Sequence, residues 1–225
     1  PGPGVRGRRA ASDGRRPAGG LSVRCYRGPR TGAPTPLRPH RHVLGDPVTA
    51  RLLVLVGTRK GAFILEGDPA RRESPDAWTL RGPFCDGWPV NHVALDPATG
   101  TVYAAASNPW FGPAVWRSED LGATWTHSSA GLEFPDGSAV AGLWHITPAD
   151  GVLHLGVEPA ALFRSTDRGA SWSLVRGLWD HPSRPTWVGG AGGLILHTIL
   201  VHPDDPRRLF VAISSAGVFA TEDDG

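Results

Sequence analysis

The sequence predicts an all-β protein, a β-propeller with four-stranded antiparallel blades that is incomplete in this chain. A short sequence motif of the pattern S/T-x-D-x-G-x-S/T-W, called the repeated phrase below, starts at residues 118 and 165. Its first five positions return at 221, so the starts lie 47 and 56 residues apart. Short apolar stretches separated by Gly, Pro and Asp fill each interval. About four strands in every ~50 residues is the unit of a propeller blade.

Each interval holds the strands of one blade. Three stretches align on a proline and are expected as innermost strands, at residues 93–97, 144–148 and 199–203. Second strands are expected at 101–106, 152–157 and 209–213, third strands at 114–117, 161–164 and 217–220, and the fourth begins at the Trp of the phrase. No segment has a 3.6-residue apolar period, so very little helix is expected.

The first repeat is expected to start with the strand that is second in the other blades. Residues 53–63 match residues 210–219, residues 66–68 are a degenerate copy of the phrase, and Trp78 is its expected closing Trp. No innermost strand precedes them. At ~50 residues per blade the chain holds about three and a half blades, and propellers have about four to eight. We therefore expect an N-terminal fragment of a six- or seven-bladed propeller.

Two regions differ in charge. Residues 1–50 contain ten Arg and two Asp, a net charge of +8, whereas residues 51–225 contain 13 Lys and Arg and 19 Asp and Glu, a net charge of −6. A basic, Pro/Gly/Arg-rich segment with few apolar residues is typical of disorder, although binding to an acidic surface is an alternative. We expect a disordered leader over 1–50 and a partial propeller over 51–225, with no nucleic-acid partner.

Composition limits the cellular compartments and the cofactors to be expected for the protein. No apolar run approaches the ~18–20 residues of a membrane span, and no secretory signal peptide is visible. Cys25 and Cys85 provide neither a disulfide framework nor a metal-ligand spacing. We expect a cytoplasmic protein without metal or cofactor that is a monomer at full length; because the chain contains no Met, its natural start is absent and export stays open.

The repeated phrase has the chemistry of a turn. The Asp carboxylate can accept backbone N–H groups, the Gly can adopt a positive φ, and the Trp can bury a large apolar face. A structural role is therefore expected for both copies rather than catalysis. The residues concerned are Asp120, Gly122 and Trp125, and Asp167, Gly169 and Trp172.

The phrase resembles the Asp-box, or BNR repeat, shared by sialidases, sortilin-type receptor domains, xyloglucan-cleaving glycosidases and a photosystem-assembly factor. The resemblance covers residues 51–225. It implies a propeller, with the boxes at the outer edge of the blades and away from the ligand-binding face, and a soluble protein of bacterial type. It therefore implies a fold and leaves the active site to be found elsewhere.

Propeller ligands generally bind at the mouth of the central channel, and the alignment places several polar residues there. Asn91 and His197 lie six residues before aligned prolines, and His92 is adjacent. Each histidine has the simpler interpretation of a satisfied residue of a strand. These three residues are candidate ligand-binding groups.

Three further candidates come from loops, which often carry function on rigid scaffolds. Glu158 follows a second strand, where the other repeats have Ser107 and Ser214, and is the candidate catalytic acid/base; a solvated loop residue is the alternative. Trp110 in the 108–112 insertion and Trp187 in the 180–187 insertion are candidate platforms for a sugar.

Sialidase chemistry is only partly matched. The resemblance implies an arginine triad, a Tyr nucleophile assisted by Glu, and an Asp acid/base. The Phe/Tyr-Arg-Ile-Pro motif of the first arginine is absent, Arg59 is a poor match, and Tyr26 and Tyr103 are not convincing nucleophiles. We expect a glycosyl hydrolase-like, exo-sialidase-like propeller that binds a glycan or other polar ligand at the channel mouth, with a catalytic partner for Glu158 from further blades. The alternative is a non-enzymatic propeller that binds a protein or peptide.

Overall fold

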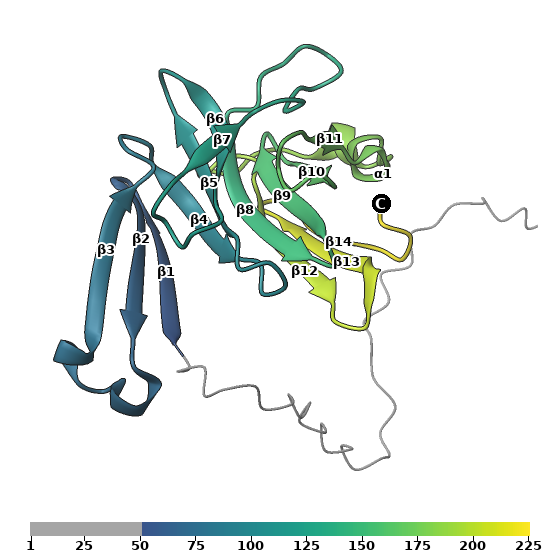
Figure 1. The fold of residues 1–225 in the computed structure, drawn as a ribbon. Coiled ribbons are helices and arrows are strands. Elements are labelled where there is room, and N and C mark those ends of the chain that lie inside the picture. The colour runs from purple at the N-terminus through teal and green to yellow at the C-terminus, as the bar shows by residue number, and fades with distance from the viewer. Residues whose placement is uncertain (1–50) are drawn as a thin grey trace, which may run out of the picture. The chain divides into compact units, whose positions relative to one another are not determined.

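The computed structural model describes residues 51–225, which form four antiparallel sheets in chain order (Figure 1). The leader predicted over 1–50 lies outside the described residues. The first sheet contains β1 (Leu52–Thr58), β2 (Gly61–Gly67) and β3 (Trp78–Phe84), and the second β4 (Val90–Leu95), β5 (Val102–Asn108), β6 (Gly112–Ser118) and β7 (Thr126–Ser128). The third contains β8 (Gly142–Ala149), β9 (Val152–Glu158), β10 (Ala161–Ser165) and β11 (Ser173–Leu174), and the fourth β12 (Leu196–His202), β13 (Asp205–Ile213) and β14 (Gly217–Thr221).

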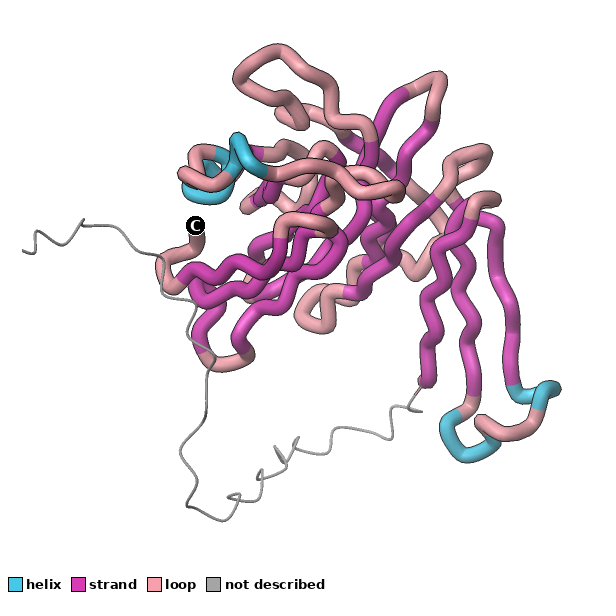
Figure 2. The backbone as a smooth tube through the Cα atoms, turned by 180° about the vertical axis from the view of Figure 1, so that it is seen from behind, coloured by secondary structure: helices cyan, strands magenta, loops and turns pink. Residues whose placement is uncertain are grey.

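Helix is scarce, as the sequence predicts (Figure 2). The helical elements are α1 (Arg176–Trp179) and three single 3₁₀ turns, η1 (Pro69–Arg71), η2 (Pro75–Ala77) and η3 (Arg184–Thr186). Within residues 51–225, no helix has the length and apolar character needed to cross a membrane. The fold is therefore built almost entirely from strands and the loops between them.

The predicted strands are confirmed. The first sheet begins with β1, which corresponds to the second strands of the next two sheets, β5 and β9. β1 packs against β4 as β5 packs against β8 and β9 packs against β12. The last strand of the first sheet starts at Trp78, whereas those of the second and third start one residue after the Trp, at Thr126 and Ser173. Two of the sheets thus have four strands and two have three.

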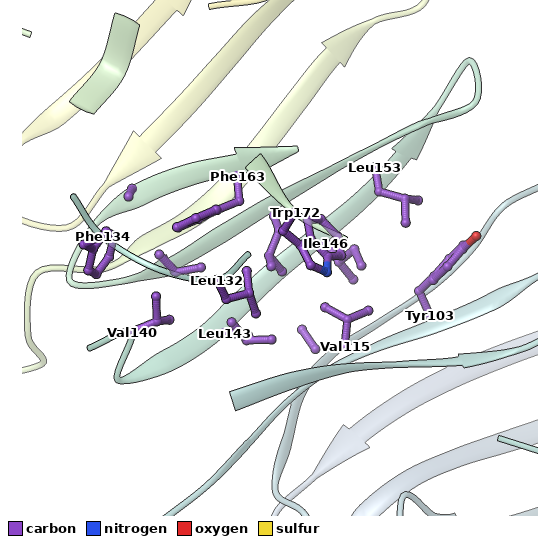
Figure 3. Packing of buried hydrophobic residues seen from close by; sticks show 14 residues of the cluster. Tyr103, Val115, Leu132, Phe134, Val140, Leu143, Ile146, Leu153, Phe163 and Trp172 are labelled. Carbon is purple, nitrogen blue, oxygen red and sulfur yellow. The ribbon is translucent and has the colours of Figure 1, made fainter. Parts of the chain in front are cut away.

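Small side chains on β5 let sheets pack on both of its faces. Successive residues of a strand point to opposite faces, and here Ala104 and Ala106 join the core against the first sheet while Tyr103 and Ala105 join the core against the third. Figure 3 shows the second of these cores, where Tyr103 and Val115 meet residues of the third sheet. Since all five residues from 102 to 106 are at most 1% exposed, β5 is a central strand of the stack.

The repeated phrase forms the same turn in the second and third sheets. The Ser118 hydroxyl donates to Asp120 Oδ1 at 2.8 Å and accepts the N–H of Gly122 at 2.7 Å. Asp120 also accepts the backbone N–H of Thr124 at 2.9 Å and its hydroxyl at 2.7 Å. These four bonds hold the turn closed. The three that Asp120 accepts, first the two from Thr124 and then the one from the Ser118 hydroxyl, hold its pKa at about 2 because they favour the charged carboxylate.

The second copy repeats this network bond for bond. Ser165 donates to Asp167 at 2.7 Å and accepts from Gly169 at 2.8 Å, while Ser171 donates its N–H and hydroxyl to Asp167 at 2.9 and 2.6 Å. The pKa of Asp167 is likewise held at about 2, with the Ser171 hydroxyl as the largest cause. The third copy starts in the same way, since Thr221 donates to Asp223 at 2.6 Å and accepts from Gly225 at 3.0 Å.

Two residues of each turn take the left-handed conformation, one more than the sequence predicts. Leu121 has φ 53° before Gly122 at 94°, and Arg168 has φ 59° before Gly169 at 81°. Position four of the phrase therefore tolerates a side chain. Position five requires Gly, because a Cβ at Gly122 would lie 2.9 Å from the Phe84 ring.

Candidate functional site

Chain direction separates the repeated turns from a loop-bearing end of the sheets. β6 starts at the turn after Asn108 and ends at the repeated turn, and β10 starts after Glu158 and ends at the second copy. The strands β4, β8 and β12 also start at this end. Figure 1 shows the β5–β6 turn and the long loop between β7 and β8 on the same, upper side of the view. We call this side the loop end.

A β-bulge lies at the start of each of these three strands. The pairing register skips Asn91 in β4, Trp144 in β8 and His197 in β12, so the three occupy equivalent positions. The alignment of Asn91 with His197 is therefore correct. The proline alignment of β8 is wrong by two residues, because Pro148 lies inside that strand, and this is why Trp144 was missed. Bulges aim a side chain out of the regular pleat and are common beside active sites.

Asn91 and His92 bind the adjacent edge of the third sheet. Asn91 Nδ2 donates to the carbonyl oxygen of Leu143 at 2.8 Å, and the N–H of Ile146 donates to His92 Nδ1 at 3.2 Å. Because an amide N–H can only donate, Nδ1 of His92 carries a lone pair and the ring is neutral. Both side chains thus have a structural role in the contact between β4 and β8, which we call the seam. Their roles in ligand binding stay predictions.

The imidazole of His92 lies on that of His145, with ring centroids 4.2 Å apart and planes 17° from parallel. Burial lowers the pKa of His92, and burial together with the charge of His92 lowers the pKa of His145 to about 4. His197, in contrast, is exposed, and its Nδ1 lies 2.8 Å from the hydroxyl of Thr198. Of the predicted histidines, His197 is therefore the one open to solvent.

Glu158 ends β9 and is held by an indole. Trp144 Nε1 donates to Glu158 Oε2 at 3.1 Å, and the Glu158 carbonyl accepts the N–H of Ala141 at 2.7 Å. Among the described residues no Lys, Arg or His forms an ion pair with Glu158. A neutral donor therefore positions the carboxyl group without a permanent counter-charge.

Glu158 differs from the serines that occupy its position in the neighbouring sheets. Ser107 accepts the N–H of Leu143 at 2.9 Å and Ser214 accepts that of Ile195 at 3.1 Å, so each satisfies the start of an inner strand. Glu158 instead extends toward Gly193, where an added Cβ would lie 2.3 Å from Oε1. The glycine-rich segment before β12 thus leaves room for a carboxyl group that has no equivalent bond to make.

The two tryptophans predicted as sugar platforms differ in exposure. Trp110 is 87% exposed in the β5–β6 turn. Trp187 is half-buried, since its ring packs 4.9 Å from that of Phe219 and its Nε1 donates to the Ser183 hydroxyl at 2.9 Å. The ring of Trp110 is therefore more accessible to a sugar than the ring of Trp187. The role of each as a platform stays a prediction.

Sequence reasoning missed the residues around Trp110. Phe111 is 77% exposed and stacks on Trp88 at 6.2 Å between centroids, and Trp88 also contacts the rings of Trp116 and His127. Two loops and the strands β6 and β7 supply this cluster, so no spacing in the sequence reveals it. Within residues 51–225 no group of three or more His, Cys, Asp or Glu is arranged to hold a metal ion.

Comparison with known proteins finds similarity in structure but no match to a family or a curated sequence. No protein-family model matches the sequence, and no curated protein matches it. Among solved structures, the chain is similar to the GH74 xyloglucanase from Xanthomonas campestris, with 22% identity and a TM-score of 0.54 over 77% of this chain and 28% of that chain. It is also similar to YCF48 bound to D1 peptide, with 15% identity and a TM-score of 0.51 over 77% of this chain and 48% of that chain.

These likenesses show the fold alone. The described residues form an incomplete β-propeller of antiparallel, four-stranded blades. The chain spans less than half the length of each of the two structures. One of them is a glycoside hydrolase and the other is a complex with a peptide, so function has to be argued from the side chains.

Proposed function

We propose that this chain is the part of a glycoside hydrolase-like propeller that binds a glycan at the loop end, where Glu158 acts as acid or base. The observation that carries the proposal is the hydrogen bond from Trp144 Nε1 to Glu158 Oε2. It holds a half-buried carboxyl group at the end of β9, beside the start of the inner strand β8, without a cation. An acid/base group must be held in one orientation. The xyloglucanase among the similar structures supports the same class of reaction.

The proposal assigns the neighbouring residues to ligand binding. Asn91, Trp144 and His197 are the three bulge residues of the inner strands, and Gly193 leaves Glu158 Oε1 uncovered by a side chain. Hydrolysis of a glycosidic bond requires a second carboxyl group about 5–10 Å from the first. The proposal therefore includes a second carboxyl group, and mutagenesis of Asp and Glu residues in the complete protein would identify it.

The decisive variant is Glu158→Gln, which keeps the shape of the side chain and removes the acid. We expect kcat for release of reducing ends from polysaccharides to fall at least 100-fold, with oligosaccharide binding changed by less than about threefold. Glu119→Gln is the matched control, since Glu119 is exposed at the far end of β6. Unchanged turnover in Glu158→Gln would contradict the acid/base role.

A non-enzymatic propeller that binds a protein or peptide is the second candidate. It is favoured by exposed apolar side chains on loops, Trp110, Phe111 and Val188, which are 87%, 77% and 73% exposed. Such side chains are typical anchors of a protein interface. The absence of any turnover, with peptide binding that survives Glu158→Gln, would select this alternative.

A further inference from the structure

A groove runs beside the β5–β6 turn, between that turn and the loop that joins β7 to β8. Two cavities of about 260 and 450 Å³ form it, and they share Phe111, Pro113 and Ser129 in their linings. Trp88 and His127 line the smaller cavity, and Leu132, Glu133 and Phe134 are among the residues that line the larger. We call the two together the aromatic groove. Because the two cavities share three lining residues, one ligand can contact both of them.

The turn that carries the exposed aromatic residues is fixed by hydrogen bonds. Asn108 Oδ1 accepts the N–H groups of Trp110 at 2.8 Å and Phe111 at 3.2 Å, and Asn108 Nδ2 donates to the carbonyl of Gly87 at 3.2 Å. The Phe111 ring then stacks on Trp88, which is only 8% exposed. The Phe111 ring is thus presented to water by a fixed turn and a buried partner, and little conformational entropy is lost when a ligand covers it.

The polar groups of the groove suit a neutral, hydroxyl-rich ligand. The side chains of His127, Ser129 and Glu133 make no hydrogen bond within residues 51–225 and are exposed. Each can bind a hydroxyl group, since together they offer donors and acceptors. Among the described residues that line the two cavities, Glu133 alone carries a permanent charge, and none is Lys or Arg.

We propose that the aromatic groove binds a neutral oligosaccharide, with one sugar ring stacked on Phe111 and hydroxyl groups bonded to His127, Ser129 and Glu133. Trp110 lines neither cavity, but it is exposed on the same turn and would stack on a further sugar ring just outside the groove. A pyranose chain carries both apolar ring faces and hydroxyl groups, and the groove offers aromatic rings to the first and polar side chains to the second. An anionic sugar such as sialic acid is disfavoured, because a carboxylate would meet Glu133 and no cation.

One end of the larger cavity lies near Glu158. Val140 lines that cavity, the next residue, Ala141, donates its N–H to the Glu158 carbonyl, and a Cβ on Gly142 would lie 3.8 Å from Glu158 Oε2. The proposal therefore places one end of the glycan chain beside the carboxyl group. This inference rests on the proposed function and deepens it, since it names the class of glycan and the surface that holds it.

The test is calorimetric titration of the full chain with cellohexaose, mannohexaose and xylohexaose, with sialyllactose as the charged comparison. We expect saturable binding of at least one neutral hexasaccharide and none of sialyllactose. The double variant Trp110→Ala/Phe111→Ala should weaken binding at least tenfold, and Glu133→Gln should weaken it about threefold or more. Val188→Ala is the matched control, since Val188 is exposed on another loop and lines neither cavity.

Each outcome decides the inference separately from the proposed function. Binding that is lost in the double variant and kept in Glu158→Gln supports the groove, whatever the turnover. Binding lost in Glu158→Gln but kept in the double variant overturns the groove and leaves the proposed function standing. Failure of all three neutral sugars, preference for sialyllactose, or saturable binding of an unstructured peptide in their place overturns the groove. Unchanged melting of Trp110→Ala/Phe111→Ala confirms folding of that variant.

Discussion

At the scale of single residues, the two complete turns depend on one carboxylate each. Asp167 accepts three hydrogen bonds from Ser165 and Ser171, and Asp120 accepts the equivalent three from Ser118 and Thr124. Because all of these bonds favour the charged form, the pKa of each Asp is lowered from 3.8 to about 2. The charge is thus used to build the turn, at the end of β6 and β10 away from Glu158.

A depressed pKa makes the stability of the turn depend on pH. The contribution of Asp167 is complete above its unfolded pKa of 3.8 and is lost as pH falls from there to about 2. Asp167→Asn should therefore lower Tm at pH 7 by about 2–4 °C, and the difference from the wild type should vanish near pH 2. Asp86→Asn, at an exposed residue, controls for net charge. A difference that persists unchanged at pH 2 would contradict this explanation.

The two closing tryptophans should differ in their contribution to stability. Trp172 is 4% exposed, and its indole N–H has no partner among the described residues, whereas Trp125 is half-buried and donates to the Gly122 carbonyl at 3.2 Å. Trp172→Ala should cost about 3–5 kcal/mol, and Trp125→Ala less. Trp172→Phe should cost under about 1.5 kcal/mol, because it keeps most of the apolar volume. Urea unfolding measures all three, and equal costs for the two Ala variants would refute the difference in packing.

The sequence predicts the residues of the turns well because they interact locally. Each bond of Asp167 spans at most four positions, so spacing alone reveals the chemistry. The carboxyl group of Glu158 was found by its difference from Ser107 and Ser214, but its partner Trp144 depends on a bulge. The aromatic groove brings together residues from Trp88 to Val140, and contacts of that range leave no periodic signal.

At the scale of elements, β4 and β8 are joined by side chains rather than by a backbone ladder. Asn91 and His92 bond Leu143 and Ile146, and the rings of His92 and His145 stack. Protonation of His92 would remove the acceptor at Nδ1, and protonation of both rings would place two positive charges face to face. The charged groups that act on His145 are His92 and His197, and no carboxylate among the described residues offsets them there.

The seam should therefore weaken in acid. The pKa of His145 is lowered from 6.5 to about 4, so its contribution to stability is complete above about pH 6.5 and is lost as pH falls toward 4. His145→Phe keeps a ring on His92 and removes the charge, and we expect it to reduce the fall in Tm between pH 7 and pH 4. His202→Gln, at the end of β12, is the control. An unchanged pH dependence in His145→Phe would contradict this role of the seam.

The elements themselves were predictable, and the bulges were not. Strands alternate with Gly, Pro and Asp turns at every predicted place, so the order of fourteen strands follows from local pattern. The inner strands start up to three residues earlier than predicted, as at Val90 for β4. A bulge inserts one residue without changing the composition of a strand. A separate error at β8 came from Pro148, which lies inside that strand but was aligned with prolines that follow β4 and β12.

At the scale of the whole described unit, the last sheet leaves an apolar face uncovered. Leu200, Phe210 and Val218 are 61%, 47% and 69% exposed, while Ile199, Leu209 and Val211 on the opposite face are at most 5% exposed. Val54 and Leu80 expose the first sheet in the same way, at 43% and 62%. Exposed faces and edges of this kind promote association between chains.

We expect the chain to associate in a concentration-dependent manner. Phe210→Ser/Val218→Ser should weaken association at least tenfold by sedimentation velocity, because it removes apolar surface from that face. Trp110→Ser is the matched control, since Trp110 is more exposed but lies in the β5–β6 turn. A monodisperse monomer with a cooperative, high-temperature melt would contradict the expected consequence of the uncovered face.

The central claim is that ligands bind at the loop end and that the repeated turns serve the fold. Hydrogen–deuterium exchange of the full chain, with and without a saturating neutral hexasaccharide, tests this claim most directly. We expect slower exchange in residues 108–113 and 129–143 and around Glu158, and unchanged exchange in residues 118–124 and 165–170. Slower exchange confined to the repeated turns, or no change at the loop end, would contradict it.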